Sequence, residues 1–151
     1  MLNNILSHLE HVSPGEETAI GHSLHHLADR INRRGLVIII SDMLDDLDNI
    51  LNGLKHFRHD KHEVLVFHIL DPREVDFAFD AQAKFKDMES GEVMATEPWH
   101  IQKDYQTAVD DFRTKLGARS REQHVDYVPL TTDQSLDVAL LAYLNKRHSV
   151  R

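Results

Sequence analysis

The chain of 151 residues contains no cysteine. Disulfides, thiolate metal ligands and thiol nucleophiles are therefore excluded. The sequence also lacks a run of about 20 apolar residues, which a membrane-spanning helix needs. It does not open with a basic segment followed by an apolar core, so we expect no secretory signal peptide. These absences predict a soluble, cytoplasmic protein.

Positive charge is also scarce, with 17 lysines and arginines against 25 aspartates and glutamates and a net charge of −8. A nucleic-acid partner is not expected, because such a surface needs clustered basic residues. The sequence has neither a glycine-rich phosphate loop nor a Gly-x-Ser-x-Gly nucleophile elbow. A phosphotransfer or hydrolase role for Asp42 would require a second aspartate two residues later, where the chain has Leu44. We therefore expect no enzymatic activity and keep that role as the weakest alternative.

Two largely apolar segments determine the predicted fold class. Leu36–Ile40 and Val64–Leu70 are rich in β-branched residues, and such runs are typical of parallel strands that are buried on both faces. Val125–Leu130 is predicted as a third strand, and Pro129 places it at an edge because proline cannot donate to a central ladder. Strands that alternate with helices predict an α/β fold of three layers around a mostly parallel sheet.

A β-hairpin is expected between Phe77 and Thr96, where the pattern alternates around a turn at residues 89–91, and we expect it to be appended to the main sheet. No linker or repeat divides the chain, so residues 1–151 are predicted to form one domain. Five helices are expected from apolar residues at helical spacing: Leu2, Ile5, Leu6, Leu9 and Val12; Ile20, Leu24, Leu27 and Ile31; Leu47, Leu51 and Leu54; Ile101, Tyr105, Val109, Phe112 and Leu116; and Leu136, Leu140, Leu141 and Leu144.

Five segments in order along the chain carry a family resemblance: residues 13–18, 34–42, 66–72, 85–92 and 126–139. The series resembles the C-terminal half of a von Willebrand factor A-like domain. More narrowly, it is similar to an uncharacterised bacterial family, domain of unknown function number fifty-eight, often encoded beside MoxR-type AAA ATPases. The resemblance implies half of a Rossmann-like sheet in a single, incomplete von Willebrand A-like domain. It also implies a non-catalytic protein-interaction module and a MoxR-type ATPase as a partner.

Such domains carry a metal-ion-dependent adhesion site, built from an Asp-x-Ser-x-Ser loop, a threonine from a second loop and an aspartate after the fourth strand. The resemblance assigns Thr18 to the second piece and Asp42, with its neighbour Ser41, to the third. No Asp-x-Ser-x-Ser occurs in the sequence. Mg²⁺ prefers near-octahedral oxygen ligation, so we expect at most weak Mg²⁺ binding and no other cofactor. Both residues also have an ordinary interpretation, Thr18 as a cap of the helix near Ala19 and Asp42 at the start of the next helix.

A second metal hypothesis rests on histidines. His22, His26 and Asp29 recur at spacings of four and three residues, on one side of a predicted helix, where a pair of imidazoles can chelate Zn²⁺. The competing interpretation is a solvated polar face, because these residues lie opposite the apolar stripe of the same helix. His56, His59 and His62 flank the end of the next helix and are expected at the surface.

The resemblance also bears on assembly. In von Willebrand A-like sheets the strand that carries the Asp-x-Ser-x-Ser loop lies beside the strand equivalent to Leu36–Ile40, and this sequence does not supply it. Leu36–Ile40 should therefore be an edge strand, with unpaired backbone groups beside large apolar side chains. A second copy of the chain would cover it, so we predict a homodimer through this edge. A continuous sheet between the two copies and an exchange of the first helix would both satisfy this argument.

Overall fold

The computed structural model describes residues 7, 11, 19–79, 83–86, 93–96 and 98–149, and residues 83–86, 93–96 and 146–149 by their backbone only. Thr18, the first predicted helix and the turn at residues 89–91 lie outside these residues. The elements are α2 (Ile20–Arg30), β1 (Leu36–Ser41), α3 (Leu47–His59), β2 (Glu63–Leu70), α4 (Pro72–Asp76), β3 (Ala83–Lys86), β4 (Val93–Thr96), α5 (Pro98–Glu122), β5 (Asp126–Thr131) and α6 (Leu136–Ser149).

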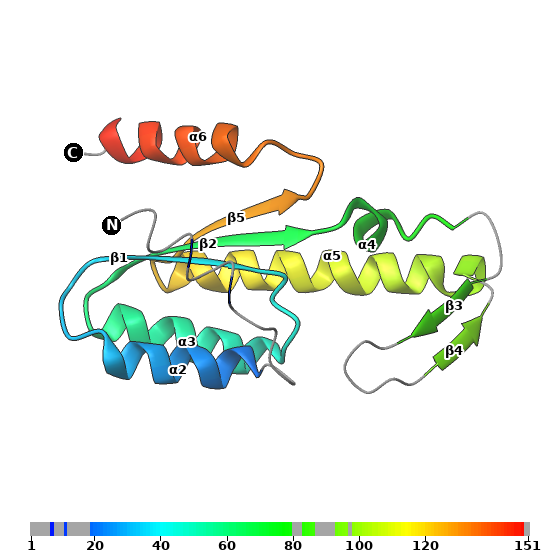
Figure 1. Cartoon of the computed structure of the whole chain (residues 1–151), viewed down its shortest axis with the longest axis horizontal. Coiled ribbons are helices and arrows are strands. Elements are labelled where there is room, and N and C mark those ends of the chain that lie inside the picture. The colour runs from blue at the N-terminus through cyan, green and yellow to red at the C-terminus, as the bar shows by residue number, and fades with distance from the viewer. Residues whose placement is uncertain are drawn as a thin grey trace.

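The main sheet has three parallel strands in the order β1-β2-β5 (Figure 1). Ile38 lies opposite Leu65 in β2, and His68 of β2 lies opposite Pro129 in β5. Six of the eight residues of β2 are buried, as the unbroken apolar run predicts for a central strand. The predicted edge position of Pro129 is confirmed, because β5 pairs with β2 alone among the described strands.

Helices cover both faces of this sheet, which confirms the predicted three-layer α/β fold. One face packs against α2, α3 and α5, and the other packs against α6 (Figure 1). The larger core lies on the first face and includes Ile50, Leu54 and Val66. The smaller core lies under α6 and is formed by Leu65, Phe67 and Tyr143. Both cores meet at β2, whose side chains alternate between them.

The α2 and α3 helices pack unusually closely, because each presents a glycine to the other. A Cβ atom on Gly53 would lie 2.7 Å from Leu24 Cβ, and one on Gly21 would lie 2.7 Å from Asn49 Cβ. The apolar stripe predicted for α2, with Ile20, Leu24, Leu27 and Ile31, is therefore wrong in part. Gly21, Leu24 and Ala28 are buried, whereas Leu27 is exposed. The buried face follows the small residues that permit the close approach.

The β1–α3 connection is longer than the sequence suggested. The α3 helix begins at Leu47, and the side chain of Asp46 caps it by accepting hydrogen bonds from the backbone N–H groups of Asp48 and Asn49. The expectation that Asp42 stands at the helix start is therefore wrong. Asp42 belongs to a loop between the end of β1 and the cap.

The β3–β4 hairpin is a separate two-stranded antiparallel sheet, so the expected hairpin exists but does not extend the main sheet. It lies near the N-terminal end of α5, which extends past the three parallel strands (Figure 1). The short α4 helix connects these regions. Asp71 and Glu74 form a capping box at its start, and the ring of Phe77, just after it, packs 4.3 Å from that of Tyr105 in α5.

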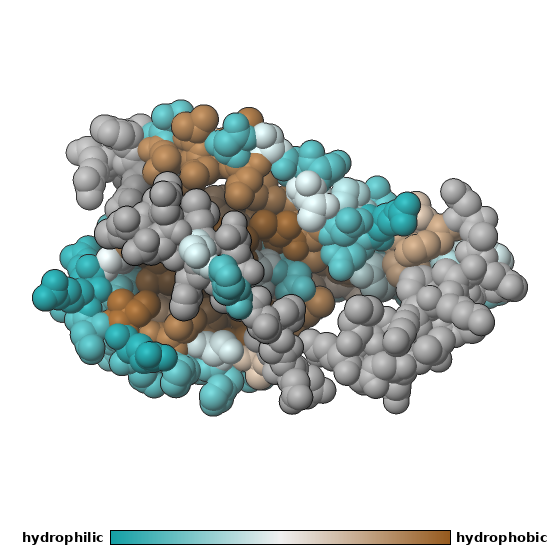
Figure 2. All heavy atoms as spheres, in the orientation of Figure 1, coloured by the Kyte–Doolittle hydropathy of each residue, from teal (hydrophilic) through white to brown (hydrophobic). Residues whose placement is uncertain are grey.

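The α6 helix is apolar on two sides. Leu140 and Tyr143 face the sheet, whereas Leu136, Val138, Leu141 and Leu144 are exposed. Figure 2 shows this apolar surface over α6, in contrast to the hydrophilic outer surface of α2. Of the four leucines from which this helix was predicted, Leu140 packs on the sheet side, whereas Leu136, Leu141 and Leu144 are exposed. No helix in the described part of the chain is long and apolar enough to cross a membrane.

Candidate functional site at the carboxyl edge of the sheet

The carboxyl ends of β1 and β2 border a cavity of about 370 Å³. In open α/β sheets, ligands bind outside the carboxyl ends of the strands. The cavity is bounded by the β1–α3 loop on one side and by α5 on the other. Its lining residues are Asp42, Met43, Leu44, Asp45, His68, Leu70, Glu74, Tyr105, Ala108, Val109, Phe112 and Arg113.

His68 is the buried polar residue at this site, with only 2% of its surface exposed. Its Nε2 lies 2.9 Å from the carbonyl oxygen of Asp42, and its Nδ1 lies 2.6 Å from the hydroxyl of Tyr127. A carbonyl can only accept, so Nε2 carries the hydrogen and Nδ1 of the neutral ring accepts from Tyr127. Burial lowers the pKa of His68 below its ordinary value of 6.5, which favours this neutral form.

Burial raises the pKa of Tyr127 to about 12, so the phenol stays protonated and can donate to His68. Arg113 of α5 lies near this pair, since its charge acts on the pKa values of both Tyr127 and His68. The chain of hydrogen bonds runs from Tyr127 through His68 to the backbone of Asp42. It therefore joins β5, β2 and the β1–α3 loop, and it fixes where the loop leaves the sheet.

Met43 is the strained residue of this loop. It has a left-handed backbone conformation with φ of 55°, and its side chain is wholly buried. Its N–H donates to Ser41 Oγ at 3.0 Å, and the Ser41 hydroxyl lies 3.3 Å from Asp42 Oδ1. Non-glycine residues rarely adopt this conformation, and such strain persists where the surroundings enforce it. Packing of Met43 and the His68 hydrogen bond provide those surroundings.

Asp45 ties the same loop to α2. Its Oδ2 accepts from the N–H of Gly21 at 2.8 Å, and its Oδ1 accepts from the N–H of Asp46 at 2.6 Å. The first of these hydrogen bonds is the leading cause of a lowered pKa for Asp45. Ala19 is the N-cap residue of α2 and has no side-chain acceptor, so Asp45 supplies the cap from another part of the chain.

The described oxygen ligands around Asp42 do not make a magnesium site. Asp42 contributes a carboxylate and Ser41 a hydroxyl, but that hydroxyl already accepts from Met43. Thr18 lies outside the described residues. Mg²⁺ needs about six oxygens in near-octahedral geometry. No group of three or more histidine, aspartate or glutamate side chains in the described part of the chain is placed to hold a metal ion.

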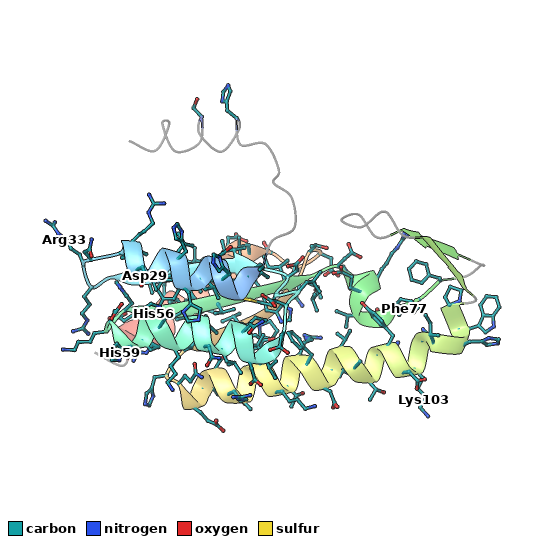
Figure 3. The ribbon with its side chains drawn as sticks, turned by 90° about the horizontal axis from the view of Figure 1, so that it is seen from below. Asp29, Arg33, His56, His59, Phe77 and Lys103 are labelled. Atoms are coloured by element: carbon teal, nitrogen blue, oxygen red, sulfur yellow. The ribbon has the colours of Figure 1, made fainter. Side chains whose placement is uncertain are left out.

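The histidines of the second metal hypothesis have different neighbours from those predicted. His22 and His26 are exposed on α2, whereas Asp29 Oδ1 lies 3.6 Å from His56 Nε2 on α3. Figure 3 labels Asp29 and His56 on these two neighbouring helices. His25 Nδ1 lies 3.1 Å from His56 Nδ1. The structure thus brings Asp29 and His25 of α2 to His56 of α3, across the contact of the two helices.

His62 is buried, so its predicted surface position is wrong. Only 1% of its surface is exposed, its Nδ1 accepts from the N–H of Gly35 at 3.2 Å, and its ring packs edge-on against Phe57. The sequence places it just beyond the end of α3, where a histidine would ordinarily be solvated. In the structure, His62 lies in the short turn that joins α3 to β2, and this turn places its ring against the core.

Sequence reasoning missed His68, Tyr127 and Arg113. A signal for His68 was present, since it is the one polar residue inside the apolar run 64–70. A polar side chain in a strand buried on both faces must find hydrogen-bond partners. Arg113 gave no comparable signal, because charged residues are common on long helices.

The parallel sheet has helices on both faces and a cavity at its carboxyl edge, so the protein is a three-layer α/β domain. Residues 1–115 match the model of the family described as "Protein of unknown function DUF58", and the chain belongs to this family. The matched span ends within α5, before β5 and α6. No curated protein and no solved structure matches the chain.

Proposed function

We propose that this protein is a non-catalytic protein-interaction domain of von Willebrand A type, which contacts its partner at the carboxyl end of β1. The observation that carries this proposal is the surface formed by Ile40, Asp42 and Leu44. Ile40 is 58% exposed and Leu44 is 69% exposed, and they stand two residues before and two residues after Asp42, whose side chain is also exposed. Asp42 and Leu44 also line the cavity, and large exposed apolar side chains near a charge resemble a protein interface.

The rigidity of this surface supports the same proposal. The His68 hydrogen bond fixes the backbone of Asp42, and Asp45 anchors the other end of the loop to α2. A preorganised loop loses little conformational entropy on binding, which favours affinity. The loop therefore presents Leu44 in one position instead of many.

The free edge of β1 supports a second copy of the chain as an additional partner. Among the described strands, β1 pairs with β2 alone, and 45% of Ile38 is exposed on it. Backbone groups on an apolar edge favour pairing with another strand. We propose a homodimer about a two-fold axis through residues 36–40.

The family resemblance proposes the heterologous partner, a MoxR-type AAA ATPase, and this proposal rests on the resemblance alone. The proposed cytoplasmic location rests on the absence of cysteine from the sequence. Asp42 would act in this interface as an exposed charge, with at most weak Mg²⁺ binding.

Titration calorimetry between the purified protein and a MoxR-type AAA ATPase tests the interface. We expect Leu44→Gln to weaken binding at least tenfold. Leu141→Gln is the matched control, because Leu141 is a similarly exposed leucine on α6. Equal effects of both substitutions would refute the proposed position of the interface, and no heat of binding with the unmodified protein would refute the partner.

A further inference from the structure

The cavity at the carboxyl edge has the size and walls of a small-molecule site. Its volume of about 370 Å³ lies in the range of ligand pockets, which is about 300–1,000 Å³. Met43, Leu70, Val109 and Phe112 give it mostly apolar walls, and Met43 and Leu70 are buried. Asp42 and Leu44 belong both to this cavity and to the proposed protein interface, but the interface proposal assigns no occupant to the cavity.

The polar groups around the cavity differ in what they can offer a ligand. His68 uses both ring nitrogens within the protein, to Asp42 and Tyr127, so it has no hydrogen bond left to offer. Arg113 lies near His68 and Tyr127, since its charge acts on the pKa values of both. Glu74 uses Oε2 to accept from the N–H of Asp71 at 2.7 Å, and Asp42 uses Oδ1 towards Ser41. Within the described contacts, one oxygen of each of these two carboxylates remains for a ligand.

The charges of the lining favour a positive ligand. Asp42, Asp45 and Glu74 contribute three carboxylates and Arg113 one guanidinium, which leaves two net negative charges around the cavity because His68 is held neutral. An apolar wall strengthens the field of such charges, since it excludes water. An anion would meet this field at the entrance, whereas a cation would be drawn in.

Two aromatic rings add to this preference. Tyr105 and Phe112 both line the cavity from α5. The faces of aromatic rings attract a cation within about 6 Å of the ring centre. The pKa of Tyr105 is raised, mainly by burial and secondly by the negative charge of Glu74. The Glu74 carboxylate therefore lies near the ring of Tyr105. A cation beside Glu74 would therefore meet a carboxylate and an aromatic ring together.

We infer that this cavity binds a small organic cation, an ammonium group on an apolar body. The ammonium group pairs with the carboxylates of Asp42 and Glu74, which both line the cavity. The apolar body fills the space against Met43, Leu70, Val109 and Phe112. The walls select for an apolar body and the entrance for positive charge, so the two parts of the ligand are recognised separately.

Three ligands with the same body and different charge test this inference: 4-phenylbutylamine, 4-phenylbutanol and 4-phenylbutyrate. Calorimetric titration of the whole protein near neutral pH should give millimolar or tighter binding of the amine. We expect the alcohol to bind at least threefold more weakly and the acid more weakly still. Equal or tighter binding of the acid, or no binding of the amine, would overturn the inference.

Two substitutions locate the binding. Val109→Phe should reduce amine binding at least fivefold by filling the cavity. Glu74→Gln should weaken binding of the amine at least threefold and leave the alcohol unchanged, because glutamine can keep the capping box of α4. Asp110→Asn is the control for the loss of one negative charge, since Asp110 is exposed on α5 and does not line the cavity. If Val109→Phe fails to fold, the binding of the amine to Glu74→Gln is the deciding measurement. The site is refuted if Glu74→Gln weakens amine binding no more than Asp110→Asn does.

Discussion

His68 and Asp42 stand 26 positions apart in the sequence, and a hydrogen bond of 2.9 Å joins the imidazole of the first to the backbone carbonyl of the second. A side chain from the central strand thus fixes the loop that follows the edge strand. The strength of this arrangement depends on Tyr127, which satisfies the other ring nitrogen at 2.6 Å. Buried polar networks of this kind contribute to stability only while every member has a partner.

Tyr127→Phe should therefore destabilise the protein, because it leaves His68 Nδ1 buried without a donor. The expected loss is about 1–3 kcal/mol of the free energy of unfolding, the usual cost of an unsatisfied buried group. Urea denaturation measures it. Tyr105→Phe is the matched control, and we expect it to change stability by less than about 0.5 kcal/mol. Similar losses in the two variants would show that the Tyr127 hydroxyl does not serve the network.

The lowered pKa of His68 predicts a loss of stability in acid. Burial holds the pKa of the folded state below the ordinary value of 6.5. Between these two values the unfolded chain binds a proton that the folded chain does not, so stability falls as the pH falls below 6.5. Above 6.5 this contribution is constant.

The measurement compares the unmodified protein with His68→Gln, because other histidines and carboxylates also titrate. Urea denaturation from about pH 8 to about pH 5 should show that the stability advantage of the unmodified protein shrinks at the acid end. An advantage that stays constant or grows in acid would contradict the lowered pKa of His68.

Gly53→Ala should disrupt the contact between α2 and α3. The added methyl group would lie 2.7 Å from Leu24 Cβ, closer than real Cβ atoms approach, so one helix must move. Overpacking of this kind costs about 1–3 kcal/mol. Gly35→Ala is the control, because its nearest neighbour in the same test is 3.8 Å away. Thermal unfolding followed by circular dichroism should separate the two variants, and equal midpoints would contradict the close helix contact.

The strands could be predicted from sequence because an unbroken run of β-branched residues fits few other positions. Residues 36–40 and 64–70 each occupy a strand of the sheet, and Pro129 correctly indicated an edge. The packing of α2 could not be predicted in the same way. Its contact with α3 depends on Gly21 and Gly53, and glycine contributes nothing to an apolar periodicity.

The site was only partly predictable because its contacts are long-range. Ser41 and Asp42 were singled out by the family resemblance, and the structure places Asp42 beside the cavity. The cap that Asp45 provides to Gly21 joins positions 24 apart, so no local motif encodes it. Asp42 itself was expected to begin a helix, and a loop with a left-handed Met43 stands there instead.

The last prediction concerns assembly through the edge of β1. Leu36 packs under α6, whereas Ile38 and Ile40 on the same side of the strand are exposed to 45% and 58%. A second copy that pairs along this edge would bury both isoleucines and satisfy the backbone groups beside them. Light scattering at micromolar concentration should give the mass of a dimer.

Ile38→Lys should shift that mass to a monomer, since it places a charge within the apolar contact. Val138→Lys serves as the control, because Val138, like Ile38, is an exposed β-branched apolar residue, with 64% of its surface exposed on α6. A dimer that Val138→Lys dissociates and Ile38→Lys does not would move the interface to α6. If light scattering gives the mass of a monomer for the unmodified protein, the homodimer is refuted. Pairing along the edge of β1 would then be too weak to hold two chains together at micromolar concentration.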